Sequence, residues 1–165
     1  TTFTLIPMVK SKINIPLIAA GGIASGQGML AAMALGADGV QVGSRFAASF
    51  ESSAHENFKN KIIETKEGGT QLTLKELAPV RLIKNKFYQD VQEAYANGAT
   101  FEDLKVLLGR ARAKRGMFEG DLEEGELEIG QIAGLINEIK TAKEIIDDMI
   151  SEFRIAKTAI NNIEL

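Results

Sequence analysis

A short apolar run and a second short strand candidate lie near the start of the chain, with a segment of helical length between them. The first covers residues 15–20 and ends at Gly21-Gly22, and the second covers residues 38–43. A short continuous apolar run bounded by proline or glycine is typical of a parallel strand that is buried on both faces. The pattern therefore predicts two parallel strands, and the spacing leaves room for one helix between them.

Helix signals lie before, between and after these two strands. Residues 4–9 read as a short helix, and a second helix is predicted from Gly26 to Leu35. Ser25 precedes this second helix as an N-cap, and Gly36 follows it where a left-handed C-terminal cap belongs. Residues 44–48 begin a further helix. The resulting order of helix, strand, helix, strand, helix is typical of consecutive βα units.

The rest of the chain is predicted to be mainly helical. Ser53 and Glu56 have the spacing of a capping box, which predicts a helix that runs to about residue 65. Further helices are predicted over residues 87–96, from Thr100 onward, over 129–139 and over 145–153. Residues 71–74 and 80–83 are short strand candidates. No second pair of buried parallel strands is predicted, so we expect the parallel sheet to be completed by residues outside this sequence, as a first residue other than methionine also suggests.

The amino-acid composition excludes several classes of function. The 165 residues are 45% hydrophobic and 25% charged, which is typical of a globular domain. The absence of cysteine excludes a disulfide scaffold, a thiolate zinc site and a cysteine nucleophile. A single histidine, His55, excludes a multi-histidine metal site, and no metal is expected. With a net charge of −3, the chain has no overall positive electrostatic potential that would attract nucleic acid. No apolar run approaches the ~18 residues of a membrane span, and no signal peptide is recognised.

The two strand ends carry the strongest chemical signal. Gly22 and Gly43 each stand where a strand turns into a helix. Glycine there removes side-chain bulk and leaves backbone N–H groups free, and a helix N-terminus adds partial positive charge that suits a phosphate. The alternative is that both glycines only make tight turns. The P-loop and dinucleotide fingerprints fail, because Gln27 follows Gly26 and the glycine spacing is wrong.

Other charged residues have two interpretations each. His55 lies in the first turn of a predicted surface helix, which favours a solvated side chain over a functional one. A basic run is followed by an acidic run, and the two either neutralise each other or present the basic run to an acidic protein or a nucleotide phosphate. The basic run is Arg110, Arg112, Lys114 and Arg115, and the acidic run is Glu119, Asp121, Glu123, Glu124, Glu126 and Glu128. Arg81, Lys84 and Lys86 form a smaller basic cluster with the same two interpretations.

Two segments make the sequence resemble a known family. IPLIAAGGIA at residues 15–24 and ALGADGVQVGSRF at 34–46 resemble the last two barrel units of the nitronate monooxygenase (2-nitropropane dioxygenase) family, which includes flavin-dependent enoyl-[acyl-carrier-protein] reductases. PVRLIKNK at 79–86, FEGD at 118–121 and GQIAGLI at 130–136 resemble the reductase branch more than the monooxygenase branch.

The resemblance implies a fold and a cofactor. The fold would be α/β, namely the last two βα units of a TIM (β/α)₈ barrel followed by a mainly helical C-terminal region. The backbone of the two glycine turns would hold the phosphate of FMN. The implied cofactor-binding residues are Ala20, Gly21, Gly22, Ile23, Gln41, Gly43 and Ser44. The catalytic histidine of the family is expected upstream of Thr1, with the first six strands of the barrel.

These implications give a division of the chain and a function. Residues 1–50 would form the barrel units, 51–128 a helical and loop segment beside the substrate, and 129–165 amphipathic helices that pack on the barrel. The expected reaction is NAD(P)H-dependent reduction of an enoyl group on acyl carrier protein, in the cytoplasm and by a homodimer. The alternatives are oxidation of alkyl nitronates by O₂ on the same flavin, and a non-catalytic fragment or interaction module.

Overall fold

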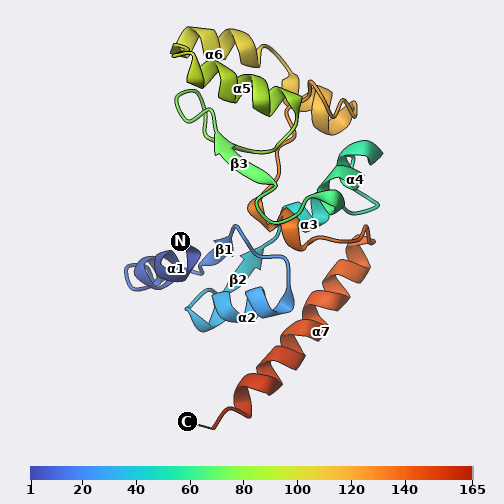
Figure 1. Cartoon of the computed structure of the whole chain (residues 1–165). Coiled ribbons are helices and arrows are strands. Elements are labelled where there is room, and N and C mark those ends of the chain that lie inside the picture. Colours follow the sequence, from blue (N-terminus) through green and yellow to red (C-terminus); the bar gives the residue numbers. More distant parts are fainter. Residues whose placement is uncertain (165) are drawn as a thin grey trace.

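The structure, a computed structural model, describes residues 1–164 and contains two small sheets surrounded by helices (Figure 1). The first part consists of α1 (Thr2–Lys10), β1 (Ile18–Ala20), α2 (Gly26–Ala34), β2 (Gly39–Gln41) and α3 (Ser44–Ala47). It is followed by α4 (Glu56–Glu64), β3 (Thr70–Thr73), β4 (Val80–Ile83), α5 (Lys86–Ala96) and α6 (Phe101–Leu108). The chain ends with the π-helix η1 (Lys114–Phe118), the 3₁₀ helix η2 (Gln131–Leu135) and α7 (Ala142–Asn161). The protein is therefore α/β, as predicted.

The first sheet is a parallel pair with a helix crossover, as the sequence predicts. Ile18 lies opposite Gly39, and Ala20 lies opposite Gln41. The backbone between the strands is fixed by the two predicted caps of α2. The Ser25 hydroxyl accepts a hydrogen bond from the N–H of Gly28 at 3.1 Å, and Gly36 adopts φ +108°. The amide of Gly36 donates to Met33 and that of Ala37 donates to Ala32, which is the hydrogen-bond pattern of a Schellman motif.

The prediction that these strands are buried on both faces is wrong for the described residues. Ala19 is 4% exposed and packs with Ile6 of α1 and Ala32 of α2, so one face of the sheet is covered by helices. Ile18 points to the opposite face, as alternation along a strand requires, and is 53% exposed. Ala20 and Gln41 lie on that same open face and are also exposed.

Helix α7 is longer than predicted and lies against α2 (Figure 1). Its Ile145 and Met149 are buried in the same core as Ala19. The approach of the two helices is close, because a Cβ atom placed on Gly26 would overlap the backbone of α7 at Met149 and Phe153. Glycine at the first position of α2 is therefore required for this packing.

The second sheet is an antiparallel hairpin in which Thr70 lies opposite Ile83. The chain later returns to the hairpin, where the Ile83 amide donates to Leu127 O and the Ile129 amide donates to Arg81 O. Helices α5 and α6 cover the hairpin through a core of buried side chains: Leu74, Leu82, Phe87, Val91 and Leu104. Helix α6 begins at Phe101, after Thr100, as predicted; Gly98 has φ +75° after α5, and Thr100 forms a capping box with Asp103.

Two helix predictions are wrong. Helix α4 begins at Glu56 rather than near Ser53, because the His55 ring nitrogen Nδ1, and not the Ser53 hydroxyl, accepts the first-turn hydrogen bond from Asn57 at 3.1 Å. The helix predicted over residues 129–139 is reduced to the single 3₁₀ turn η2, which Gly130 precedes and which contains Gly134. Helix propensity is low at glycine, and the isoleucine spacing alone does not compensate.

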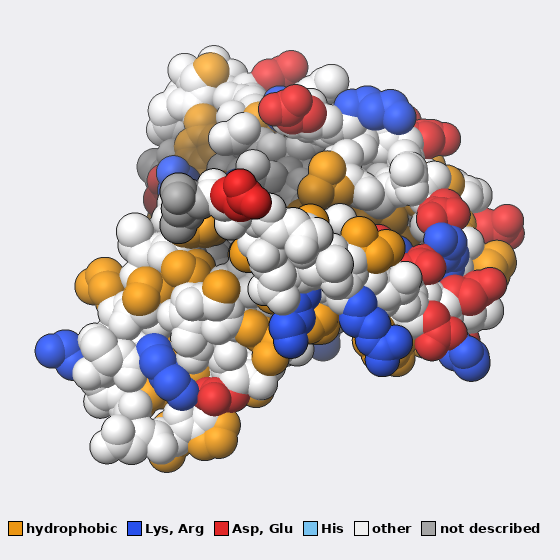
Figure 2. Space-filling view, turned by 90° about the horizontal axis from the view of Figure 1, so that it is seen from below, with side chains coloured by type: hydrophobic (Ala, Val, Ile, Leu, Met, Phe, Trp, Pro, Cys, Tyr) orange, Lys and Arg blue, Asp and Glu red, His pale blue; other side chains and the backbone are white. Residues whose placement is uncertain are grey.

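Several large apolar side chains remain on the surface of the described residues. Hydrophobic side chains reach the surface over much of the face in Figure 2, between charged ones. The exposed apolar side chains of the described residues include Phe3 (68% exposed) and Met8 (66%) of α1 and Ile155 (66%) of α7. Among the described residues, no helix combines the length and apolar character that crossing a bilayer requires.

Candidate functional site

The two glycine turns predicted from the sequence lie at the same edge of the parallel sheet. The register aligns Ala20 with Gln41, so the turn at Gly21-Gly22 lies beside the turn at Gly43. Gly21 has φ +98° and Gly22 has φ +72°, which are conformations that side-chain-bearing residues rarely adopt. Gly43 is the residue before α3 and has φ −107°. The positive φ angles explain why the first turn uses two glycines in succession.

The backbone at these turns is available to a ligand. Within residues 1–164, the N–H groups of Gly21, Gly22, Ile23, Gly43 and Ser44 donate no hydrogen bond to another protein group. A Cβ atom built on Gly21, Gly22 or Gly43 would meet no atom within 4 Å, so the space beside them is open. Several unpaired N–H groups around open space suit an anion such as a phosphate.

Of the other predicted site residues, Ala20 and Gln41 lie at the strand ends, and Ile23 has its side chain in the core. Ala20 and Gln41 face each other at the ends of the strands, on the open side of the sheet. The side chain of Ile23 is 6% exposed and belongs to the core between α1, α2 and α7, so only its backbone can contact a ligand. The structure thus brings all seven predicted positions to one edge of the sheet.

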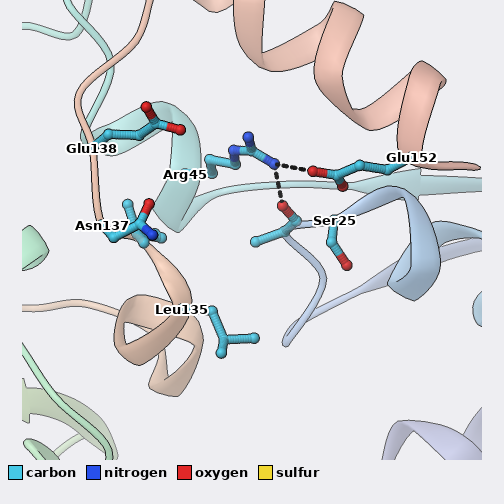
Figure 3. A pocket seen from close by; sticks show the side chains of 8 residues that line it. Ser25, Arg45, Leu135, Asn137, Glu138 and Glu152 are labelled. Atoms are coloured by element: carbon cyan, nitrogen blue, oxygen red, sulfur yellow. Dashed lines mark hydrogen bonds and ion pairs between the residues drawn. The ribbon is translucent and has the colours of Figure 1, made fainter.

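The N-terminus of α2 does not contribute its first amide to the site. The carboxylate of Glu152 accepts a hydrogen bond from the N–H of Gly26 at 2.6 Å. Arg45, which follows Ser44, also forms its hydrogen bonds with other groups. Figure 3 shows its guanidinium facing Glu152, and it donates to Ala24 O at 2.6 Å and to Asp148 at 3.2 Å. A phosphate at the turns would therefore be bound by backbone N–H groups rather than by this arginine.

A cleft opens beside the first glycine turn, at Gly21-Gly22. Its volume is about 850 Å³, and it is lined by Gly21 and Gly22, by Arg81 of β4, and by Gly130 with residues of η2. The start of η2 is attached to the second turn, because the N–H of Gly130 donates to the Ser44 hydroxyl at 3.2 Å. The cleft therefore joins the predicted phosphate site to the hairpin and to η2.

Sequence reasoning named Arg81 only as a member of a basic cluster with two interpretations, and it did not assign Gly130 or Gln131 to a site. A signal existed, because these residues lie in two segments that carry the resemblance to the reductase branch, at 79–86 and 130–136. Neither segment has a spacing that places it near Gly22, and only the tertiary fold brings them together.

The other charged candidates act within the fold. His55 is exposed, as predicted, and its ring caps α4. Three members of the basic run pair with members of the acidic run: Arg112 with Glu124 at 3.6 Å, Lys114 with Glu119 at 3.1 Å and Arg115 with Asp121 at 2.6 Å. Mutual neutralisation of the two runs is thus confirmed for these pairs.

Glu126 is the acidic residue with the most unusual environment. Its side chain is 6% exposed beside η1, and burial raises the pKa of its carboxyl to about 7. The nearby carboxylate of Glu128 raises that pKa further, while Arg112 acts in the opposite direction. No group of three His, Asp or Glu side chains in residues 1–164 has the geometry of a metal site.

Comparison with known proteins identifies a family that the chain matches over most of its length. Residues 1–152 match the nitronate monooxygenase family. A probable nitronate monooxygenase from Staphylococcus saprophyticus is 34% identical over 152 residues, which are 92% of this chain and 42% of that protein.

Two solved structures are similar to the chain. FabK from Thermotoga maritima is 43% identical with a TM-score of 0.87, over 98% of this chain and 51% of that one. A nitroalkane oxidase from Streptomyces ansochromogenes is 28% identical with a TM-score of 0.76, over 96% of this chain and 45% of that one. The chain spans about half the length of these relatives.

Proposed function

The chain belongs to the nitronate monooxygenase family, and from this membership we propose that it is part of an FMN-dependent oxidoreductase that reduces enoyl thioesters with NAD(P)H. The single observation that carries the proposal is the pair of adjacent glycine turns, with open space and unpaired N–H groups at the ends of two parallel strands. In a (β/α)₈ barrel, phosphate sites commonly form at the loops after the seventh and eighth strands. We assign β1 and β2 to these two strands.

The residues of this chain would bind the cofactor through its phosphate. The N–H groups of Gly22, Ile23, Gly43 and Ser44 would donate to the phosphate oxygens, and the absence of side chains at the glycines would permit close approach. The open face of the sheet, with Ala20 and Gln41, would lie beside the rest of the cofactor. When bound, FMN would supply the hydride chemistry that none of these residues provides.

The residues around the cleft would orient the substrate. The hydrogen bond from Gly130 to Ser44 holds the start of η2 against the turn that would bind the phosphate. A substrate in the cleft would therefore be confined between η2 and the glycine turn. The proposal places no catalytic residue in this chain, in agreement with the expectation of a histidine before Thr1.

The choice of reductase over nitronate monooxygenase rests on similarity. The structure that is described as a nitroalkane oxidase is only 28% identical to the chain, compared with 43% for FabK. The cleft is lined by Arg81 of the segment 79–86 and by several residues of the segment 130–136, and both segments resemble the reductase branch. Nitronate oxidation is the second candidate, because the curated relative from Staphylococcus saprophyticus carries that description.

Steady-state assays of the flavin-loaded protein decide between the two reactions. We expect NAD(P)H oxidation to depend on an added enoyl thioester such as crotonyl-coenzyme A, and to proceed without O₂. We expect slow turnover of propyl-2-nitronate in air. Rapid nitronate oxidation without any enoyl-dependent NAD(P)H oxidation would contradict the reductase assignment, and protein that binds no FMN would contradict the flavin assignment as well.

A further inference from the structure

Arg81 is the cationic side chain of the 850 Å³ cleft, and its guanidinium is only partly used. Its Nη1 donates to the carbonyl oxygen and to the hydroxyl of Thr70, both at 3.2 Å. Within residues 1–164, its Nε and Nη2 form no hydrogen bond, and no carboxylate lies within 4.0 Å of the group. These two atoms carry the side-by-side N–H groups with which arginine binds phosphate or carboxylate in a bidentate manner.

Comparison with the other half-buried arginines shows that this arrangement is unusual in the chain. Arg45 pairs with Asp148 at 3.2 Å, and Arg112 pairs with Glu124 at 3.6 Å. Removing a cation from water is costly unless a counter-ion compensates. Arg81 is also partly buried but has no carboxylate partner among the described residues, and its Nε and Nη2 are not enclosed, so they are accessible to an anion that enters the cleft.

The position of Arg81 is fixed before any ligand arrives. Its backbone pairs with Leu72 in the hairpin, its carbonyl oxygen accepts from Ile129 at 3.1 Å, and its side chain is held by Thr70. A pre-oriented guanidinium loses less side-chain entropy on binding than a free one. The other charged residue of the cleft is the exposed Glu67, whose negative charge would weaken the binding of an anion.

We propose that Arg81 binds a phosphate group of the substrate that enters the cleft, while the glycine turns hold the flavin. The proposal rests on the proposed function, and the phosphate belongs to a pyridine nucleotide or to the phosphopantetheine arm of an acyl thioester. Both sources present a phosphate dianion or diester to the same two N–H groups. Separate ligands for the two sources therefore identify which substrate Arg81 serves.

The test measures dissociation constants by calorimetry with the flavin-loaded protein, using the oxidised nucleotides NADP⁺ and NAD⁺, which cannot reduce the flavin, together with 4′-phosphopantetheine and pantetheine. We expect Arg81→Gln to weaken the phosphate-bearing ligand about 10-fold to 100-fold and Arg81→Lys to weaken it less. Glutamine can still donate to Thr70, so the hairpin should fold. Lys84→Gln is the matched control, because it removes the same charge from an exposed residue three positions along the chain. Glu67→Gln should tighten binding about twofold to fivefold.

The pattern of losses identifies the phosphate. Weaker binding of NADP⁺ alone indicates its ribose phosphate, weaker binding of NADP⁺ and NAD⁺ together indicates the pyrophosphate, and weaker binding of 4′-phosphopantetheine alone indicates the acyl arm. The proposal is overturned if Arg81→Gln binds all four ligands as the unmodified protein does, or if it loses FMN, which would place Arg81 in the flavin site. Because binding is measured without turnover, a failure of enoyl reduction would overturn the proposed function and leave this test interpretable.

Discussion

The hydroxyl of Ser44 accepts a hydrogen bond from the backbone N–H of Gly130 at 3.2 Å. The two residues are far apart in the sequence, and their contact joins the turn after β2 to the loop before η2. The N–H of Ser44 remains available for a phosphate, so this residue serves the site with its backbone and the cleft wall with its side chain.

A double-mutant cycle at these two residues should show strong coupling. Gly130 has φ −67°, which any residue adopts, but a Cβ atom there would lie 2.7 Å from the Ser44 hydroxyl oxygen. We expect Gly130→Ala to lower the free energy of unfolding by about 1–3 kcal/mol. In the Ser44→Ala background the cost should fall by about 1 kcal/mol. Equal costs in both backgrounds, measured by urea denaturation, would show that the contact is not formed.

Gly22→Val should abolish retention of FMN. The new side chain would enter the open space beside the unpaired N–H groups, where we place the phosphate. Gly98→Val is the matched control, because Gly98 has φ +75° against +72° for Gly22, also has no atom within 4 Å of a built Cβ, and lies at the end of α5. Both variants carry the same backbone strain, so the visible absorbance of bound flavin should be lost only in Gly22→Val. Yellow Gly22→Val protein would falsify the site.

Arg112 should contribute to stability rather than to docking of a partner. Its guanidinium lies 4.4 Å from the centre of the Phe87 ring and donates to the carbonyl oxygens of Leu107, Leu108 and Glu124. We expect Arg112→Ala to lower the free energy of unfolding by about 2–4 kcal/mol. The exposed Arg110 serves as the control, and Arg110→Ala should change stability by less than about 0.5 kcal/mol. Similar small changes in both variants would contradict a structural role for Arg112.

Glu126 should make stability depend on pH. Its folded-state pKa of about 7 lies above the usual value of 4.5, so the folded protein favours the protonated carboxyl. The protonated Glu126 carboxyl therefore contributes about 2–3 kcal/mol to the free energy of unfolding. This contribution is complete below about pH 4.5 and is lost as the pH rises through 7. Glu126→Gln should remove this loss between pH 5 and pH 8. An unchanged pH profile in that variant would show that another group causes the dependence.

Local sequence signals predicted the βα part of the fold well. Ser25 and Gly36 delimit α2 because a hydroxyl cap and a left-handed glycine act over a few residues. The strand register follows from the same local geometry, since Ala20 lies opposite Gln41 with the same offset along the chain that separates Gly22 from Gly43. The two glycine turns could therefore be predicted together.

Features that depend on distant contacts could not be predicted. The role of Arg112 depends on carbonyl groups and an aromatic ring that only the folded chain assembles around it. The cleft depends on the return of residues 127–130 to the hairpin and to Ser44, which no local pattern indicates. The isoleucine spacing over 129–139 predicted a helix, but the two glycines and the pairing of Ile129 with Arg81 favour a short 3₁₀ turn instead.

The most direct test of the central claim is a crystal structure of the flavin-loaded protein. We expect the phosphate oxygens of FMN to lie about 2.7–3.2 Å from the backbone nitrogens of Gly22, Ile23, Gly43 and Ser44. We also expect Arg45 to remain paired with α7, and Arg81 to make no contact with the phosphate of the flavin. A phosphate bound away from the two glycine turns, or one held mainly by either arginine, would contradict the central claim.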